Sequence, residues 1–315
     1  QTHLDRMSDA GVIDYDGDEV ALTSEAQELD VYLDIVPASS ISWGLYYLGL
    51  SGLAAAVLFG VWVEFVPTDE KVEIIDALSE TGVDEIEITS FTHPKAVPTL
   101  RDADEVAKRI ERYDDVTYRA LVPNAVGMER AIDAGVDKVN ALVTVSETYS
   151  EHNQNMTVEE ILEGVEEIVA MAEGTGIEVE AGMGTSFYCP YEGRIPMEDT
   201  LAVVDRVVDA GVDEVTLATT MGLADPVEIE EMYTAVFDRH PDLDAGLHLH
   251  DTNGMSLANT LVAMQCGVDR FDASHCGLGG GVVLPGGLSL AGHTPTADPV
   301  QLPMQMGVET SADFD

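Results

Sequence analysis

The chain has 315 residues, 45% of them hydrophobic, which is enough for one large domain with a sizeable core and a small second domain. Its formal net charge is −45, from 59 acidic and 14 basic side chains, and this excludes non-specific nucleic-acid binding because phosphates would be repelled. Such acidity is typical of a protein made for a salt-rich cytoplasm, where ions screen the repulsion between like charges.

Residues 1–36 predict a small module of their own. The stretch LDRMSDAGVIDYDGDEVALTSEAQ favours a helix, two strands joined at Asp16-Gly17, and the start of another helix. This order resembles the back half of a winged-helix module. Arg6 is the only lysine or arginine in this stretch, so we expect a remnant or a protein-contact surface rather than DNA binding.

Residues 41–63 form an uncharged segment whose length fits the hydrocarbon core of a bilayer. Trp43 lies near one end and Phe59 and Trp62 near the other, as the aromatic residues of a membrane helix do. We therefore predict a transmembrane helix that anchors an otherwise cytoplasmic domain. The alternative is a buried segment, in which residues 55–63 form a strand of the following domain.

Residues 64–315 contain a repeated pattern in which a helix ends at a glycine and Val-Asp leads into an apolar run. The four copies are TGVDEIEITS (81–90), AGVDKVNALV (134–143), AGVDEVTLAT (210–219) and CGVDRFDASH (266–275). Further strands are predicted at 117–124, 178–187 and 245–250. A helix over 68–80 followed by seven strand–helix units predicts a (β/α)8 TIM barrel whose first strand is missing or replaced. An open, doubly wound sheet is the alternative.

The strongest candidate site is the segment LHLHDTNG, residues 247–254. In a (β/α)8 barrel the active site lies at the carboxyl ends of the strands. His248 and His250 are two residues apart on a strand, so both side chains face the same way and could bind a metal ion. The adjacent Asp251 favours this interpretation, because ligating histidines are commonly oriented by a carboxylate.

Three other segments place polar groups at the expected barrel mouth. Glu87 lies in an apolar strand, where a carboxylate is costly unless it is paired or functional. Lys95 and Arg194 are among the few cations on the mouth loops and could bind an anionic substrate, although a salt-bridge role is equally open for each. The glycine-rich loop 276–287 could approach a phosphate or an acyl group through its backbone N–H groups, or could be only a connector.

Taken together, these motifs resemble the 3-hydroxy-3-methylglutaryl-CoA lyase family. The segments that carry the resemblance are VPTDEKVEIIDALSETGVDEIEITSF, HPKAVP, LVPN, CPYEG, HLHDTNGMSLANTLVAMQCGVD and GLGGG, in family order from Phe65 to about Asp298. The resemblance implies cleavage of an acyl-CoA substrate to acetyl-CoA and acetoacetate with the help of Mg²⁺ or Mn²⁺. We also expect a homo-oligomer, a dimer.

The site expected on this basis combines residue reasoning with the family's pattern. Its members are the catalytic residues Glu87, Asp251 and Cys276, the substrate contacts Ser90, Phe91, Lys95, Arg194, Thr219, Gly279 and Gly280, and the metal ligands His248, His250 and His293.

The sequence departs from the family at several of these positions. The family's first strand begins with Arg-Asp-Gly, which supplies an arginine and a metal carboxylate, whereas the matching sequence here starts near Glu64 without that motif. Thr219 stands in place of a family aspartate, Gly281 in place of a mobile-loop cysteine, and His293 in place of an asparagine ligand. We expect His293 to bind metal and Cys276 to replace the missing acid, in a site with impaired activity.

Two other functions stay open from the sequence. A condensing enzyme of the isopropylmalate or citramalate synthase type would use the same barrel and the same pair of histidines. Alternatively, the chain is an inactive barrel tethered to a membrane through residues 41–63.

Overall fold

The computed structural model describes residues 13–15, 20–22, 66–274, 277, 292–308 and 310. The chain divides into two compact units, residues 1–65 and 66–315. In the first unit, β1 (Ile13–Tyr15) pairs antiparallel with β2 (Val20–Leu22), which confirms two strands on either side of Asp16-Gly17. The winged-helix assignment stays a prediction, because the rest of that module lies outside the described residues.

The second unit contains one sheet of seven parallel strands. They are β3 (Glu85–Ser90), β4 (Thr117–Val122), β5 (Lys138–Thr144), β6 (Glu178–Gly184), β9 (Glu214–Thr219), β10 (Asp244–Leu249) and β11 (Arg270–Asp272). Each overlaps a strand predicted from the sequence. Their spatial order, β11-β10-β9-β6-β5-β4-β3, follows the chain without a reversal, which excludes the doubly wound alternative.

The helices alternate with these strands. They are α4 (Thr68–Ser79), α5 (Ala103–Arg109), α6 (Ala125–Ala134), α7 (Glu147–Asn153), α8 (Val158–Ala172), α9 (Met197–Ala210), α10 (Pro226–Arg239), α11 (Ser256–Cys266) and α12 (Ala297–Met306). A short 3-10 helix, η2 (Pro98–Leu100), precedes α5, and a small hairpin of β7 (Tyr188–Cys189) and β8 (Gly193–Arg194) precedes α9.

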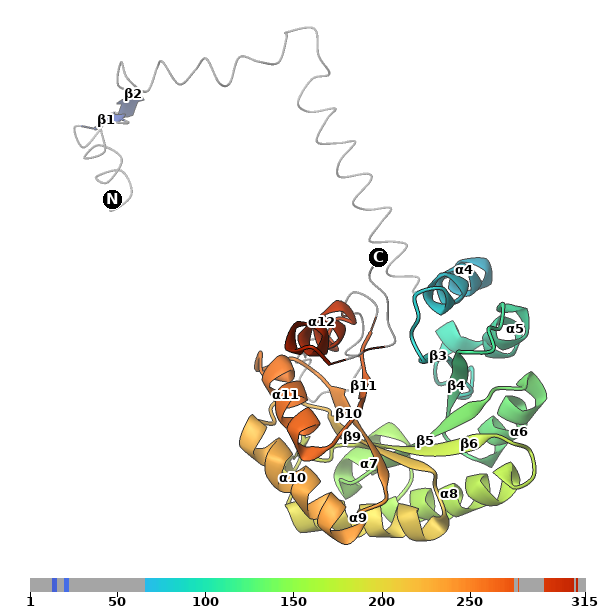
Figure 1. The fold of residues 1–315 in the computed structure, drawn as a ribbon. Helices are drawn as coiled ribbons and strands as arrows, with labels where there is room; N and C mark the ends of the chain where they lie inside the picture. Colours follow the sequence, from blue (N-terminus) through green and yellow to red (C-terminus); the bar gives the residue numbers. More distant parts are fainter. Residues whose placement is uncertain are drawn as a thin grey trace, which may run out of the picture. The chain divides into compact units, whose positions relative to one another are not determined.

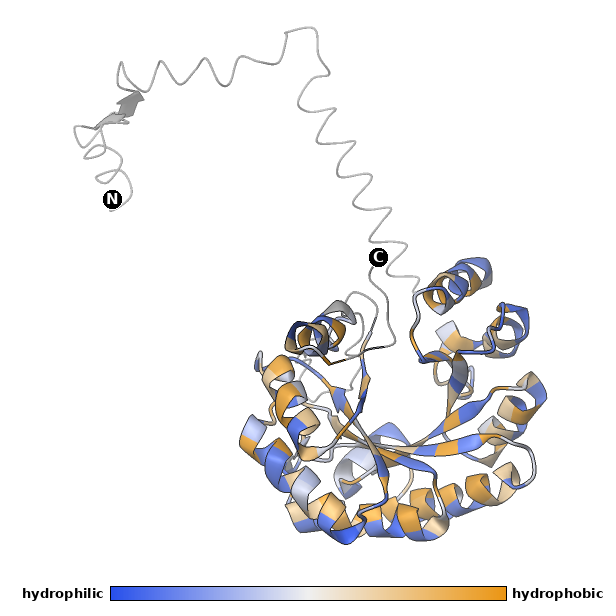
Figure 2. Cartoon of the chain, in the orientation of Figure 1, coloured by the Kyte–Doolittle hydropathy of each residue, from blue (hydrophilic) through white to orange (hydrophobic). Residues whose placement is uncertain are grey.

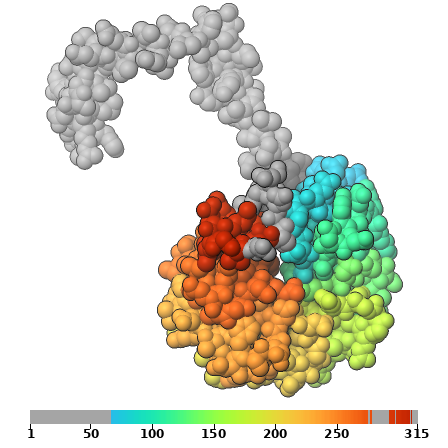
Figure 3. Space-filling view, viewed as in Figure 1, coloured from blue at the N-terminus to red at the C-terminus, as the bar shows by residue number. Residues whose placement is uncertain are grey.

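Among the described strands, the curled sheet is open between β3 and β11, which are the two ends of the strand order. Figure 1 shows the strands curling round with the helices on their outer side. Since α4 precedes β3 and each later strand is followed by a helix, the described part is a (β/α)8 barrel short of its first strand, as predicted. In Figure 3 the elements of the two ends, α4 in blue-cyan and α12 in red, lie on opposite sides of one face of the molecule.

Local signals set the helix ends. Thr157 and Glu160 form a capping box at the start of α8, and Asp225 caps α10 with Pro226 as its first residue. Gly135, Gly211 and Gly267 follow α6, α9 and α11 with left-handed backbone, a conformation that is easiest for glycine.

The two faces of the sheet differ in polarity. Apolar residues of the strands face the helices and form the core, and members of this set include Ile86, Val139, Val179, Val215 and Leu247. The alternate positions face the inside of the curl, and many carry charged or polar side chains, such as Glu87, Lys138 and Asn140, although Leu142 and Ala218 also lie there (Figure 2). The period of two along each strand therefore places the chain's chemistry on the concave side.

Some sequence predictions lie outside the described residues. They concern segment 41–63 and the loop residues Cys276, Gly279, Gly280 and Gly281. Among the described residues, no helix is both long and apolar enough to cross a membrane.

Candidate metal centre

The carboxyl end of β10 carries the two histidines singled out from the sequence. His248 lies on the concave side of the strand, in register with Ala218 of β9 and Asp272 of β11. His250 follows immediately after the strand, and its backbone N–H donates to Thr219 Oγ1 at 3.2 Å. The hydroxyl of Thr219 donates in turn to the carbonyl of His248 at 3.5 Å. Thr219 therefore holds the backbone that carries both imidazoles.

His293 completes a group of three histidines. The ring centroids of His248 and His293 are 4.6 Å apart, those of His250 and His293 4.4 Å, and those of His248 and His250 5.2 Å. One nitrogen from each ring lies within 4.8 Å of the other two, so the group could hold a metal ion. The structure thus brings together all three residues that the sequence predicted as ligands. We call this group the histidine triad.

Asp272, at the end of β11, orients His248 of the triad. Its carboxylate lies 2.7 and 2.8 Å from Nδ1 of His248, which leaves Nε2 of His248 to face a metal. Burial alone would raise the pKa of Asp272, but the neighbouring His248 lowers it to about 2. Asp251 does something else: its Oδ1 accepts a hydrogen bond from Ser256 N at the start of α11. The carboxylate that supports the histidines is therefore Asp272, which the sequence analysis did not select.

The protonation state of His293 suits metal binding. Burial, together with the nearby imidazoles of His248 and His250, lowers the pKa of His293 to about 4. His293 is thus neutral at pH 7, with one nitrogen lone pair free to bind a cation. Burial would lower the pKa of His248, but the carboxylate of Asp272 raises it.

Arg119 of β4 connects the triad to Glu87. Its guanidinium lies 3.1 Å from Glu87, 2.8 Å from Glu85, 2.7 Å from Glu180 and 3.5 Å from Asp272. Burial would lower the pKa of Arg119, but these four carboxylates raise it well above its usual value. Because Arg119 contacts both Glu87 and Asp272, the predicted catalytic glutamate and the histidine triad belong to one polar network.

Glu87 is the most accessible carboxylate bound to Arg119. Its side chain is 34% exposed, whereas that of Glu180 is 1% exposed. Its Oε2 also accepts a hydrogen bond from Asn140 Nδ2 at 3.2 Å. Two donors therefore fix one oxygen of Glu87 while the side chain remains open to a ligand.

A second charged group, which we call the basal cluster, lies at the amino ends of the strands. Lys138 opens β5 and lies 3.0 Å from Glu85 and 3.8 Å from Glu180, and it also contacts Glu214. Arg270 opens β11 and lies 3.3 Å from Glu214. The Lys138 side chain is only 2% exposed, so the acids and bases of this cluster compensate one another in the interior.

The remaining predicted contacts differ in accessibility. Lys95 is exposed, and Ser90 shares a 2.7 Å hydrogen bond with Thr92 just beyond β3. Phe91 is only 2% exposed, and its ring lies beneath the guanidinium of Arg130 at 4.9 Å. A substrate could not reach that ring without rearrangement, so Phe91 acts here as a core residue.

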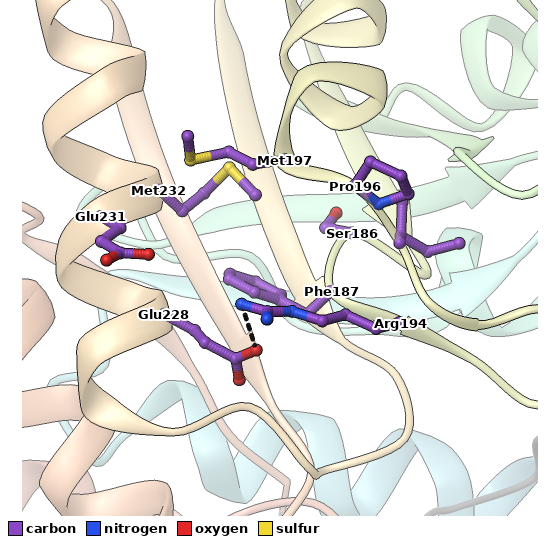
Figure 4. A pocket seen from close by; sticks show the side chains of 9 residues that line it. Ser186, Phe187, Arg194, Pro196, Met197, Glu228, Glu231 and Met232 are labelled. Atoms are coloured by element: carbon purple, nitrogen blue, oxygen red, sulfur yellow. Dashed lines mark ion pairs between the residues drawn. The ribbon is translucent and has the colours of Figure 1, made fainter.

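Arg194 lines a separate pocket of about 250 Å³, between the start of α9 and the first turns of α10. Its guanidinium lies 2.9 Å from Glu228, and Figure 4 shows these two side chains pointing toward one another. The other lining residues include Phe187, Met197 and Met232, so the pocket combines an ion pair with an apolar wall. None of the three triad histidines lines this pocket.

Several polar residues of the interior could not be identified as site residues from the sequence. Arg119, Lys138, Asn140, Glu180 and Asp272 were not selected, although each is a polar residue among apolar neighbours of a predicted strand. Their spacing of two within β5 (Lys138, Asn140) and β6 (Glu178, Glu180) was the available signal. That signal could not say which partner each residue contacts, because partners on neighbouring strands depend on register.

Comparisons with known proteins agree with this geometry. The profile of the HMGL-like family matches residues 62–313. Hydroxymethylglutaryl-CoA lyase YngG of Bacillus subtilis is 38% identical over 251 residues, covering 80% of this chain and 82% of the relative. The mitochondrial hydroxymethylglutaryl-CoA lyase of Mus musculus is 36% identical over 249 residues, covering 79% and 76%.

A solved structure supports the same relationship. An HMG-CoA lyase from Acinetobacter baumannii, in complex with coenzyme A and 3-methylmalate, matches with a TM-score of 0.74 and 36% identity, covering 80% of this chain and 81% of that one. The family resemblance read from the motifs is confirmed. This chain belongs to the HMGL-like family.

Proposed function

We propose that this chain is a metal-dependent carbon–carbon lyase that cleaves 3-hydroxy-3-methylglutaryl-CoA to acetyl-CoA and acetoacetate. The observation that carries the proposal is the convergence of His248, His250 and His293 at the carboxyl end of β10. Relatives named as lyases of this substrate, at 38% and 36% identity, support the same reaction. The coenzyme A in the Acinetobacter baumannii lyase structure supports an acyl-CoA substrate.

The triad would hold the divalent cation that this reaction requires. When bound, the cation supplies a Lewis acid for the carboxylate and tertiary hydroxyl of the substrate. Of the two cations expected from the family, Mn²⁺ suits three imidazoles better than Mg²⁺, which prefers oxygen ligands. His248 is held in place for this task by Asp272.

The chain's own residues would then move the protons. Glu87, fixed by Arg119 and Asn140, accepts the proton of the substrate hydroxyl. As the carbon–carbon bond breaks, its electron pair passes to the thioester fragment and the hydroxyl carbon becomes the ketone of acetoacetate. The thioester enolate needs one proton to become acetyl-CoA, and we assign that proton to Cys276, which lies outside the described residues. Asp251 would act indirectly, by fixing the start of α11 beside His250.

The substrate contacts stay proposals. Lys95 is exposed and able to meet an anionic group. Arg194 is already paired with Glu228, so a substrate anion would have to displace that carboxylate. We also propose a homodimer and a membrane anchor at 41–63. Analytical ultracentrifugation would test the dimer, and carbonate extraction of the expressed chain would test the anchor.

The test of the reaction uses the full chain. Incubation with 3-hydroxy-3-methylglutaryl-CoA and Mn²⁺ should release acetoacetate, and the His248→Ala variant should release none above background. His152→Ala, which removes an exposed histidine from α7, is the matched control and should keep the full rate. Wild-type and His248→Ala samples with the same rate would refute the proposal. Acetyl-CoA plus a 2-oxo acid should give no condensation product.

We expect slower turnover than in the Bacillus subtilis relative, because the described sheet is open between β3 and β11. In the family the strand with the Arg-Asp-Gly motif supplies a metal carboxylate, so its return should speed the reaction. A chain carrying that motif before Glu64 would be compared with the chain as it stands. Equal rates would show that the site is not impaired.

A further inference from the structure

The third histidine of the triad comes from a separate segment that is fastened to β10. His293 and His250 form an antiparallel bridge. Thr294 N donates to the carbonyl of Leu249 at 3.2 Å, and Asp251 N donates to the carbonyl of Gly292 at 3.3 Å. The backbone on both sides of His293 is therefore bound to the strand that carries the other two histidines, which brings its imidazole to them before any cation arrives.

Among the histidine, cysteine, aspartate and glutamate side chains of the described residues, only imidazole nitrogens meet at this site. The described residues that meet within 4.8 Å are His248, His250 and His293, with no carboxylate in the group. Asp272 is the nearest supporting acid, and both of its oxygens face Nδ1 of His248. It therefore serves the imidazole rather than the cation.

Three imidazoles discriminate between classes of metal ion. Mg²⁺ takes oxygen ligands in octahedral geometry and gives up water reluctantly. Imidazole suits Zn²⁺, Cu²⁺, Fe²⁺ and Ni²⁺, whereas carboxylate, carbonyl and water oxygens suit Mg²⁺ and Mn²⁺. For a given set of ligands, affinity rises from Mn²⁺ through Fe²⁺ to Co²⁺. We propose that the triad selects a first-row transition-metal ion over Mg²⁺, with Co²⁺ and Zn²⁺ bound more tightly than Mn²⁺, and that His293 sets this selectivity. The inference rests on the metal dependence of the proposed function.

The experiment measures binding rather than turnover. The full chain, stripped of metal with a chelator, is titrated with CoCl₂ while the visible absorption of Co²⁺ bound to nitrogen ligands is followed. ZnCl₂, MnCl₂ and MgCl₂ are then tested as competitors. We expect one equivalent of Co²⁺, displacement by Zn²⁺, weak displacement by Mn²⁺ and none by millimolar Mg²⁺.

Two variants test the role of His293. His293→Asn replaces a nitrogen donor with an amide oxygen, so Co²⁺ affinity should fall by at least about 10–100-fold, the loss typical even of changes to groups behind the ligands. The ratio of its affinity for Co²⁺ to its affinity for Mn²⁺ should also be smaller than in the wild-type chain. His152→Asn removes an exposed histidine that stacks on Tyr191, and its Co²⁺ affinity should equal that of the wild-type chain. Circular dichroism of the metal-free forms confirms that each variant folds.

The outcomes separate this inference from the proposed function. If Mg²⁺ displaces Co²⁺ as readily as Mn²⁺ does, or if His293→Asn binds Co²⁺ like the wild-type chain, the selectivity is refuted while the lyase remains possible. If the wild-type chain selects Co²⁺ and yet releases no acetoacetate, the proposed reaction fails and the selectivity stands. If no divalent ion binds, the selectivity and the proposed metal-dependent reaction are both refuted.

Discussion

The inside of the curled sheet holds two groups of polar residues. They differ in whether their buried side chains have partners of opposite charge. At the amino ends of the strands, the basal cluster sets the cations Lys138 and Arg270 beside the acidic side chains of Glu85, Glu180 and Glu214. At the carboxyl ends, the histidine triad turns three like groups toward one another. Backbone hydrogen bonds between the two segments, rather than opposite charges on the side chains, hold its members together.

This difference indicates which group is structural and which is functional. Buried charges that pair with one another lose their hydration, but the opposite charge compensates for it and no bound ligand is required. Three nitrogen donors that meet at one point make sense when a cation binds there. The barrel architecture agrees, because in this fold active sites form at the carboxyl ends of the strands, whereas the amino ends serve stability.

The largest expected effect is a loss of stability when the basal cluster is broken. Lys138→Met keeps an unbranched side chain of nearly the same length but leaves Glu180 and Glu214 buried without their lysine. Removing one partner of a buried ion pair typically costs about 3–5 kcal/mol, so the free energy of unfolding should fall by that amount. Denaturant unfolding followed by circular dichroism measures it.

A surface ion pair provides the control for Lys138→Met. Arg206 lies 3.0 Å from Glu159, and their side chains are 41% and 61% exposed. Arg206→Met should therefore cost less than about 1 kcal/mol. If Lys138→Met is no more costly than Arg206→Met, the basal cluster does not stabilise the fold and the contrast with the triad fails.

The next largest effect concerns Asp272, whose carboxylate holds His248 in place. Asp272→Asn preserves the shape of the side chain but removes the charge beside Nδ1 of His248. Changes to a group behind a ligand typically lower metal affinity by about 10–100-fold, and we expect a loss in that range for Mn²⁺. Isothermal titration calorimetry of the metal-free chain measures it.

A matched histidine–carboxylate pair exists on the outer helices. His240 Nε2 lies 2.7 Å from Asp205 Oδ1, between α10 and α9. Asp205→Asn should leave Mn²⁺ affinity unchanged. Equal affinities in the Asp272→Asn and wild-type chains would remove Asp272 from the metal site.

Much of the fold could be predicted because its signals are local. The glycine and Val-Asp pattern marked the ends of helices and the starts of strands, and caps such as Thr157 with Glu160 lie where they were expected. The alternation of strands with helices also predicted that the strands would lie in the sheet in the order in which they occur along the chain. These signals need no knowledge of which residues meet across the sheet.

The candidate site was only partly predictable for the opposite reason. His248 and His250 share a strand, so their common direction follows from spacing alone. Asp272 is in register with His248 only because β11 pairs with β10 at that position. Arg119 likewise meets carboxylates of β3, β6 and β11, which depends on how the sheet curls.

The last expected effect concerns Glu180, the member of the basal cluster that also contacts Arg119. Burial raises the pKa of Glu180 to about 7, with Glu214 adding to the rise and Arg119 and Lys138 opposing it. Its Oε1 has no hydrogen-bond partner among the described residues, which agrees with a carboxyl group that holds its proton. The cluster is therefore fully balanced only when Glu180 is protonated.

This predicts a pH dependence with a definite sign. In the unfolded chain a glutamate titrates near pH ~4.3, so between there and pH 7 the folded state holds a proton that the unfolded state has released. The contribution of Glu180 to stability is thus fully present below pH ~4.3 and is lost as pH rises to 7. Glu180→Gln cannot titrate, so its free energy of unfolding should fall less than that of the wild-type chain between pH 5 and 7.5. Unfolding curves across that range measure the difference, and identical slopes would show that Glu180 is ionised and that the basal cluster is balanced without its proton.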